Sequence, residues 1–279
     1  MSLKVVNLSK RYSDKWVLRD VSFEVTSGEV YGLFGPSGSG KSTLLRAIQG
    51  LTSLSSGLVF RDDINVTKMN QSSRNFTLVR TSPESVWQRY LQNKRWMPKG
   101  RSESENIIGS LESAENVLLL DDSFCAMDPR ETESLLERTR DAAKERGIAV
   151  IFASNNFEQI LLACDRVAVI VSGEIKQFGL PQEIYEKPEC SAVAEVTGRN
   201  NLFAARRLTS SKAEIPEFQT IDGGHRLFAQ RIERPALGAL NQNVTLAIRP
   251  EQISISFGAS FPEDNLLRAT VKRIQFLGP

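Results

Sequence analysis

The sequence predicts an α/β domain with a mostly parallel sheet, followed by a small all-β domain. Its 279 residues exceed what one ordinary core holds. Over the first two-thirds, short apolar runs alternate with helical patterns, and several of these runs are uncharged and rich in Val and Ile, as in sheets whose strands are buried on both faces. From about Arg199, strand patterns alternate with turn-forming Gly, Asn and Pro residues. We therefore expect two domains, 1–198 and 199–279.

The elements of the first domain follow from this alternation. Five apolar runs predict strands, at Leu3–Val6, Val30–Phe34, Val117–Leu120, Ile148–Ala153 and Val167–Val171. A helix is expected from Lys41 to Gln49, and the clearest helical pattern runs from Pro129 to Gly147. Proline suits the first turn of a helix and glycine suits its C-cap, so both ends of this second helix are marked.

Turn signals organise the second domain. The lone histidine, His225, lies beside the turn Asp222–Gly224, so we expect it on the surface of a hairpin. A convincing strand pattern at Leu267–Phe276 is followed almost at once by Pro279. We therefore expect this domain to be incomplete, through a shortened gene or a shortened expressed segment.

Composition excludes several classes of protein. Lys plus Arg number 35 and Asp plus Glu number 33, so the net charge of +2 gives no general attraction to nucleic acid. No stretch reaches the roughly 18 apolar residues of a membrane helix, and the first residues lack a signal-peptide pattern. Cys125, Cys164 and Cys190 match neither a zinc spacing nor a disulfide framework, and we expect them to be buried in a reducing compartment.

A phosphate-binding loop is the strongest motif in the chain. Residues 35–43 are GPSGSGKST, which match G-x-x-x-x-G-K-[ST] between an expected strand and an expected helix. Glycines let backbone N–H groups turn toward phosphate oxygens, and the helix N-terminus adds partial positive charge. Lys41 should reach the β- and γ-phosphates, and the Ser42 hydroxyl should bind Mg²⁺. The predicted nucleotide site comprises Gly35, Pro36, Ser37, Gly38, Ser39, Gly40, Lys41, Ser42 and Thr43.

A carboxylate at the end of a later strand completes the predicted metal site. The run Val117–Leu120 ends in Asp121, which we expect to hold Mg²⁺ through a water or a hydroxyl. The Asn-Lys-x-Asp pattern of guanine-binding proteins does not occur in the sequence. A kinase or GTPase is therefore a poor fit.

These residues resemble the ATP-binding subunit of an ABC transporter over nearly the whole chain. The resemblance is greatest to importers whose ATP-binding subunit has a C-terminal β-barrel regulatory domain. Tyr12, in SKRYSDKW, matches the aromatic residue that stacks on adenine in that family. Residues 121–128 resemble the family's magnesium-binding strand and the dimer-contact loop that follows it. Residues 165–182 resemble its closing strands and helix, and residues 245–251 resemble the signature of its barrel domain.

The resemblance implies an ABC-type P-loop NTPase fold with a small OB-like second domain. It implies that the chain binds ATP and Mg²⁺ to drive or regulate the import of a small solute or ion. The implied partners are a membrane permease subunit and a second nucleotide-binding subunit, in a homodimer or heterodimer, with no nucleic acid. The implied location is cytoplasmic, at the inner face of the cell membrane.

Several catalytic positions depart from the family pattern. Asp122 stands where the family has its catalytic glutamate, and Asn155 stands where it has its switch histidine. The lid glutamine falls at Thr81 or Ser82. Asp is one methylene shorter than Glu, and Asn cannot carry a charge. We therefore expect ATP hydrolysis to be weak.

The helical subdomain of the family is also reduced. It would occupy about 82–110, with one helix at Glu84–Arg95. The family signature motif falls at Met97–Arg101, where Gly100 alone is retained. The basic residues between Arg80 and Arg101 have two interpretations: a patch for nucleic acid or anionic lipid, or a solvated or partner-facing helix.

Three functions remain open at this point. The chain could be a transporter ATPase with residual activity, paired with an intact partner. It could be a nucleotide-binding regulatory subunit without ATP turnover. It could also be a protein without a transporter that uses its basic segment for other contacts.

Overall fold

The computed structural model describes residues 2–80, 103–124, 127–198, 200–208, 216–228 and 239–253. The chain divides into two compact units, Met1–Gly198 and Arg199–Pro279. Six features of the sequence analysis lie outside the described residues: Thr81, Ser82, the helix at Glu84–Arg95, Met97–Arg101, Cys125 and the strand at Leu267–Phe276. Among the residues that are described, no helix is long and apolar enough to cross a membrane.

A six-stranded sheet in the order β10-β9-β3-β8-β7-β6 forms the centre of the first unit. Its strands are β3 (Val30–Phe34), β6 (Phe76–Arg80), β7 (Val117–Asp121), β8 (Ala149–Ser154), β9 (Arg166–Val171) and β10 (Glu174–Gly179). All neighbouring pairs are parallel except β9 and β10, which are antiparallel. The side chains of β3, β7 and β8 are buried throughout, as their apolar sequences predict.

A second sheet is antiparallel, in the order β2-β1-β4-β5. Its strands are β1 (Leu3–Tyr12), β2 (Lys15–Val25), β4 (Ser56–Arg61) and β5 (Ile64–Asn65). The strand predicted at Leu3–Val6 is confirmed as the start of β1, and it lies in this antiparallel sheet. One face of β1 is covered here, so Leu3 and Val5 are buried while Lys4 between them is exposed.

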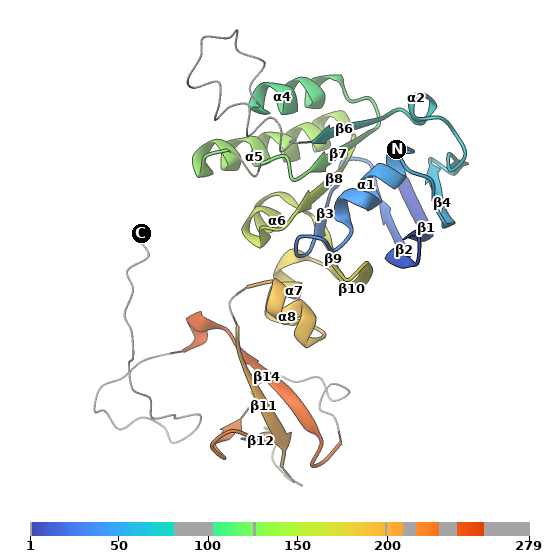
Figure 1. Ribbon diagram of the computed structural model, residues 1–279. Coiled ribbons are helices and arrows are strands. Elements are labelled where there is room, and N and C mark those ends of the chain that lie inside the picture. The colour runs from blue at the N-terminus through green and yellow to red at the C-terminus, as the bar shows by residue number, and fades with distance from the viewer. Residues whose placement is uncertain are drawn as a thin grey trace, which may run out of the picture. The chain divides into compact units, whose positions relative to one another are not determined.

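Helices cover both faces of the central sheet (Figure 1). The helix α1 (Lys41–Gln49) shares one core with the antiparallel sheet and the facing side of the central sheet. The other core includes side chains of α4 (Glu103–Ser113), α5 (Pro129–Arg146), α6 (Phe157–Ala163), α7 (Pro181–Glu186) and α8 (Ser191–Val196). A short helix, α2 (Gln71–Arg74), precedes β6.

The boundaries of α5 confirm the sequence prediction. Asp128 is the N-cap, and its carboxylate accepts a hydrogen bond from the N–H of Glu131 at 2.9 Å. Pro129 occupies the first turn, and Gly147 is the C-cap with a φ of 63°. Glycine adopts this left-handed conformation without the strain that other residues incur, so the helix ends there.

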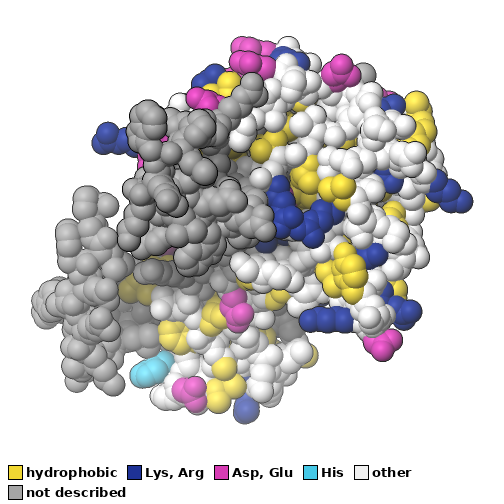
Figure 2. Space-filling view, turned by 45° about the horizontal axis from the view of Figure 1, so that its top comes forward, with side chains coloured by type: hydrophobic (Ala, Val, Ile, Leu, Met, Phe, Trp, Pro, Cys, Tyr) yellow, Lys and Arg dark blue, Asp and Glu magenta, His cyan; other side chains and the backbone are white. Residues whose placement is uncertain are grey.

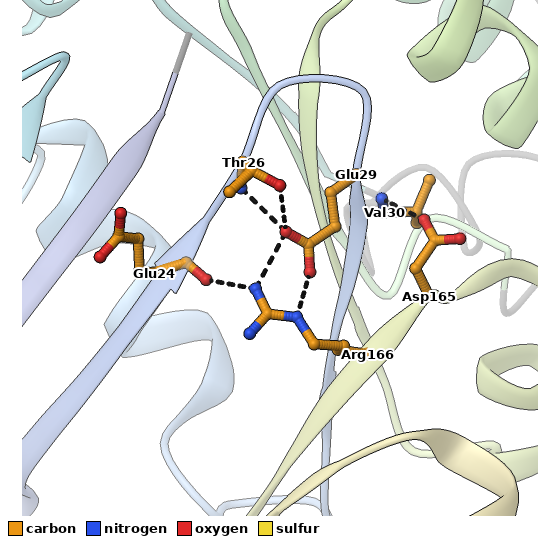
Figure 3. A network of polar contacts seen from close by, with 6 residues as sticks. All are labelled: Glu24, Thr26, Glu29, Val30, Asp165 and Arg166. Atoms are coloured by element: carbon orange, nitrogen blue, oxygen red, sulfur yellow. Dashed lines mark hydrogen bonds and ion pairs between the residues drawn. The ribbon is translucent and has the colours of Figure 1, made fainter.

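A network of polar contacts joins β2, β3 and β9 at the amino edge of the central sheet (Figure 3). The Arg166 guanidinium donates to the Glu29 carboxylate at 2.6 Å and to the Glu24 carbonyl at 2.9 Å. The Glu29 carboxylate also accepts from the N–H and the hydroxyl of Thr26. Asp165 accepts a hydrogen bond from the N–H of Val30 at 2.9 Å. These contacts fix the start of β3, the strand that leads into the phosphate-binding loop.

The expectation that the cysteines are buried holds for one of the two that the structure describes. Cys164 is buried against β3, and burial raises the pKa of its thiol. Cys190 is exposed, so the expectation that it is buried is wrong. Its apolar neighbours Val193 and Ala194 on α8 face the core instead, and the cysteine lies just before that helix.

The second unit contains an antiparallel sheet in the order β13-β12-β11-β14. Its strands are β11 (Asn201–Arg207), β12 (Glu217–Thr220), β13 (Arg226–Phe228) and β14 (Asn243–Ile248), and a 3-10 turn follows at Pro250–Gln252. His225 is exposed in the hairpin between β12 and β13, as predicted. That this unit is part of a β-barrel remains a prediction.

The described surface carries both signs of charge. On the face shown in Figure 2, Lys and Arg side chains form separate groups, with acidic and hydrophobic side chains between them. This distribution matches the near balance of basic and acidic residues in the sequence.

Candidate nucleotide site at the carboxyl edge of the central sheet

Four parallel strands end side by side at the carboxyl edge of the central sheet. In the strand register, Phe34 pairs with Ser154, Asp121 with Ala153, and Arg80 with Asp121. The residues at or after these ends therefore lie along one edge. Ligands of open α/β sheets bind outside this edge, so it is the candidate site.

The loop after β3 requires glycine at defined positions. A Cβ on Gly35 would lie 2.1 Å from the carbonyl oxygen of Ile170, so no side chain fits there. Gly38 and Gly40 have φ angles of 80° and 106°, which favour glycine. A Cβ on Gly38 would meet no heavy atom within 4 Å, so open space lies beside the loop. The helix α1 begins directly afterwards, at Lys41.

Lys41 spans this loop. Its ammonium donates hydrogen bonds to the carbonyls of Gly35 at 2.7 Å and Pro36 at 3.1 Å, and the residue is only 4% exposed. Burial lowers the pKa of Lys41, whereas the nearby charges of Asp122 and Asp121 raise it. The cation is therefore held in the loop, where anionic oxygens would meet it.

Ser42 and Asp121 form an oxygen pair next to the loop. The Ser42 hydroxyl donates a hydrogen bond to Asp121 Oδ1 at 2.8 Å, and Asp121 is 2% exposed. A hydroxyl and a carboxylate beside a phosphate site suit Mg²⁺, which binds one or two protein oxygens together with phosphates and water. The described residues include no cluster of three or more His, Cys, Asp or Glu that could hold a metal alone. The residues present thus fit a metal that arrives with a nucleotide.

Arg80 is a site residue that the sequence analysis did not identify. It is the last residue of β6, and its Nε lies 3.6 Å from Asp121 Oδ2. In the sequence, Arg80 stands out only as part of a basic segment. The available signal was the end of the strand Phe76–Arg80, which follows a parallel-sheet pattern and so ends at the same edge as Asp121.

Asp122 and Asn155 lie at the same edge. Asp122 follows β7 with a φ of 47°, and its N–H donates to the Ala153 carbonyl at 3.1 Å. Burial raises the pKa of Asp122; Lys41 opposes this shift, Asp121 adds to it and Arg80 opposes it. The Asn155 amide donates to the Ser37 hydroxyl at 3.4 Å. The structure therefore places both substituted positions beside the phosphate-binding loop.

Tyr12 lies on the turn between β1 and β2. The residue is 47% exposed, the Lys10 ammonium lies 4.6 Å from the ring centroid, and the Tyr12 hydroxyl lies 3.4 Å from that of Thr52. The following strand contacts the loop, since a Cβ on Gly40 would lie 2.8 Å from Leu18. An exposed ring on this hairpin is available for stacking, and its adenine role remains a prediction.

Comparison with a family model identifies the first unit. The model described as ABC transporter matches residues 18–146, which include the loop, Arg80 and Asp121. The chain contains an ABC transporter ATP-binding domain. Two solved structures share the fold of this domain. A nucleotide-free ATP-binding cassette from an ABC transporter gives a TM-score of 0.56 at 19% identity, over 71% of this chain and 100% of its own. The ADP conformation of another ABC cassette gives 0.55 at 18% identity, over 70% and 98%.

Curated relatives match more of the chain than this domain. The spermidine/putrescine import ATP-binding protein PotA of Fusobacterium nucleatum is 26% identical, over 91% of this chain and 76% of its own. The protein of the same name from Protochlamydia amoebophila is 27% identical, over 90% of this chain and 76% of its own. The resemblance to importer ATP-binding subunits is thereby confirmed, and the match of residues 18–146 to this ATPase family implies ATP as the ligand.

Proposed function

We propose that the chain is the ATP-binding subunit of an ABC importer and binds ATP with Mg²⁺ at the carboxyl edge of its central sheet. The observation that carries this proposal is the joint placement of Lys41 in the glycine loop and of Ser42 on Asp121. Ser42 and Asp121 would hold the metal. Bound Mg²⁺ would neutralise phosphate charge and orient the terminal phosphates.

The chain's own residues bind the triphosphate by charge and by backbone N–H groups. The Lys41 ammonium exchanges two neutral carbonyls for anionic oxygens, which accept stronger hydrogen bonds. The N–H groups at the start of α1 face the same oxygens, with the favourable end of the helix dipole. Tyr12 stacks on the base.

Hydrolysis is the weak step of this proposal. Asp122 and Asn155 are well placed beside the loop but differ from the family residues in reach and in charge. Phosphoryl transfer depends on positioning and on charge stabilisation, so these substitutions slow it even though both side chains are present. ATP binding is therefore retained more fully than turnover.

The partners and the location follow from the importer relatives. The proposed partners are a membrane permease subunit and a second nucleotide-binding subunit, at the inner face of the membrane. Because both curated relatives are named for spermidine and putrescine import, polyamines are the first transported substrates to test. The comparisons do not favour a regulatory protein without ATP turnover or a protein without a transporter.

Two measurements on the purified chain test the proposal. Calorimetric titration with ATP and Mg²⁺ should give saturable binding, and a single-turnover assay should give hydrolysis far below that of ordinary transporters. Absence of binding at millimolar ATP would overturn the site. Hydrolysis at the rate of ordinary transporters would overturn the proposal of weak hydrolysis but not that of ATP binding. Co-expression with a candidate permease should recruit the chain to the membrane fraction, and failure with every permease tried would overturn the partner assignment.

A further inference from the structure

Arg80 places a permanent positive charge on the proposed metal carboxylate. Its Nε lies 3.6 Å from Asp121 Oδ2, and the other oxygen of that carboxylate accepts the Ser42 hydrogen bond at 2.8 Å. A guanidinium stays charged at any pH that a protein tolerates. Both oxygens of Asp121 therefore have a partner from the chain itself.

The charges of four described side chains at this edge balance without a metal. Asp121 and Asp122 supply two negative groups, and Lys41 and Arg80 supply two positive groups. A site with Lys41 alone would have an excess of carboxylate charge, which repels a triphosphate until a divalent cation compensates it. With Arg80 in place, these four side chains carry no net charge before any metal arrives.

Exposure distinguishes Arg80 from a purely structural ion-pair partner. Its side chain is 44% exposed, although the carboxylate it contacts is 2% exposed. The guanidinium thus bridges a buried acid and open space at the edge where the nucleotide would bind. Guanidinium groups bind phosphate oxygens through paired hydrogen bonds, so one group can contact both Asp121 and a phosphate.

We propose that Arg80 is a binding-site cation that takes over part of the electrostatic role of Mg²⁺. The chain then binds ATP with little dependence on Mg²⁺, and this inference rests on the proposed function. The Arg80 charge also weakens the binding of a divalent cation to Asp121, because both cations would contact the same carboxylate and repel each other.

The test is the ratio of ATP dissociation constants measured in EDTA and in excess Mg²⁺. The variants are Arg80→Met, Arg80→Lys and the control Arg140→Met. Arg140 is a matched control because it pairs with Asp165 at 3.8 Å and is 45% exposed. Asp165 contacts Val30, so this pair lies at the opposite edge of the same sheet. Thermal melting reports whether each variant folds.

The unmodified chain and Arg140→Met should show a ratio below about 10, and Arg80→Met should raise it at least about tenfold, the size of one charged contact. Arg80→Lys should give an intermediate or unmodified ratio. A ratio above about 100 in the unmodified chain overturns the inference, and so does an unchanged ratio in folded Arg80→Met. If Arg80→Met fails to fold, Arg80→Lys and the unmodified ratio decide. Absence of binding with Mg²⁺ in the unmodified chain overturns the proposed function itself.

Discussion

The two edges of the central sheet carry different kinds of polar chemistry. At the amino edge, the charged groups are paired by the chain itself, as in the bond of Arg166 to Glu29 at 2.6 Å. At the carboxyl edge, Arg80 pairs with Asp121 at 3.6 Å, but the Lys41 ammonium is buried against two neutral carbonyls, and burial raises the pKa of Asp122. The first arrangement serves stability, whereas the second leaves charge available for a ligand. Four variants test this division, in order of expected effect.

Lys41→Met should cause the largest loss, at the carboxyl edge. Removal of the buried ammonium takes away its charged contacts to phosphate, so ATP affinity should fall about 100-fold, or roughly 2.7 kcal/mol. The melting temperature should not fall, because methionine fills similar space without the cost of a buried charge. Titration calorimetry and thermal melting measure the two effects. Lys144→Met, on the exposed face of α5, is the control and should change neither.

Arg166→Met should show the reverse pattern, at the amino edge. The Glu29 carboxylate, 8% exposed, would lose its ionic partner, so the free energy of unfolding should fall by about 2 kcal/mol. ATP affinity at 25 °C should change by less than about twofold. Denaturant unfolding and ATP titration provide the measurements. A large loss of ATP affinity with intact stability would contradict the division between the edges.

The carboxyl edge was more predictable from the sequence than the amino edge. The phosphate loop, α1 and Asp121 were predictable because glycine spacing and a strand ending in Asp are local patterns. The pairing of Glu29 with Arg166 joins residues 137 positions apart, and no local pattern indicates it. Arg80 was missed because the strand that ends at Arg80 was not predicted, and the register of β6 with β7 is what places Arg80 beside Asp121. The strand at Leu3–Val6 was predictable, but its antiparallel partners were not, because an apolar run does not specify its partner strand.

Asp122→Glu, at the carboxyl edge, should raise the rate of ATP hydrolysis. The added methylene extends the carboxylate by about 1.5 Å toward the phosphates, so single-turnover hydrolysis should rise about tenfold. ATP affinity should stay the same, because Asp122 is not a group that binds the phosphates. Asp141→Glu, the same change at an exposed position of α5, is the control and should leave hydrolysis unaltered. An unchanged rate in Asp122→Glu would show that the carboxylate length is not the limiting departure.

Glu29→Gln should give the smallest effect, measured as a change in how steeply stability falls in acid. Burial alone would raise the pKa of Glu29, but the Arg166 guanidinium and the Thr26 donors hold it below its ordinary value of 4.5. A carboxyl group with a lowered folded pKa stabilises the fold above pH 4.5, and this stabilisation is lost as pH falls through the folded pKa. The unmodified chain should therefore lose stability in acid more steeply than Glu29→Gln. Midpoints of denaturant unfolding from pH 7 to pH 3 measure the difference.

Glu174 provides the matched comparison for this last effect. The pKa of Glu174 is also lowered, mainly by its hydrogen bond to the Lys176 ammonium, but this pair lies at the surface. Solvent and salt screen exposed pairs, so Glu174→Gln should leave the loss of stability between pH 7 and pH 3, the acid limb, almost unchanged. If both variants flatten the acid limb equally, the amino edge is no more stabilising than an ordinary surface ion pair. The contrast between the two edges would then rest on the ATP-binding side alone.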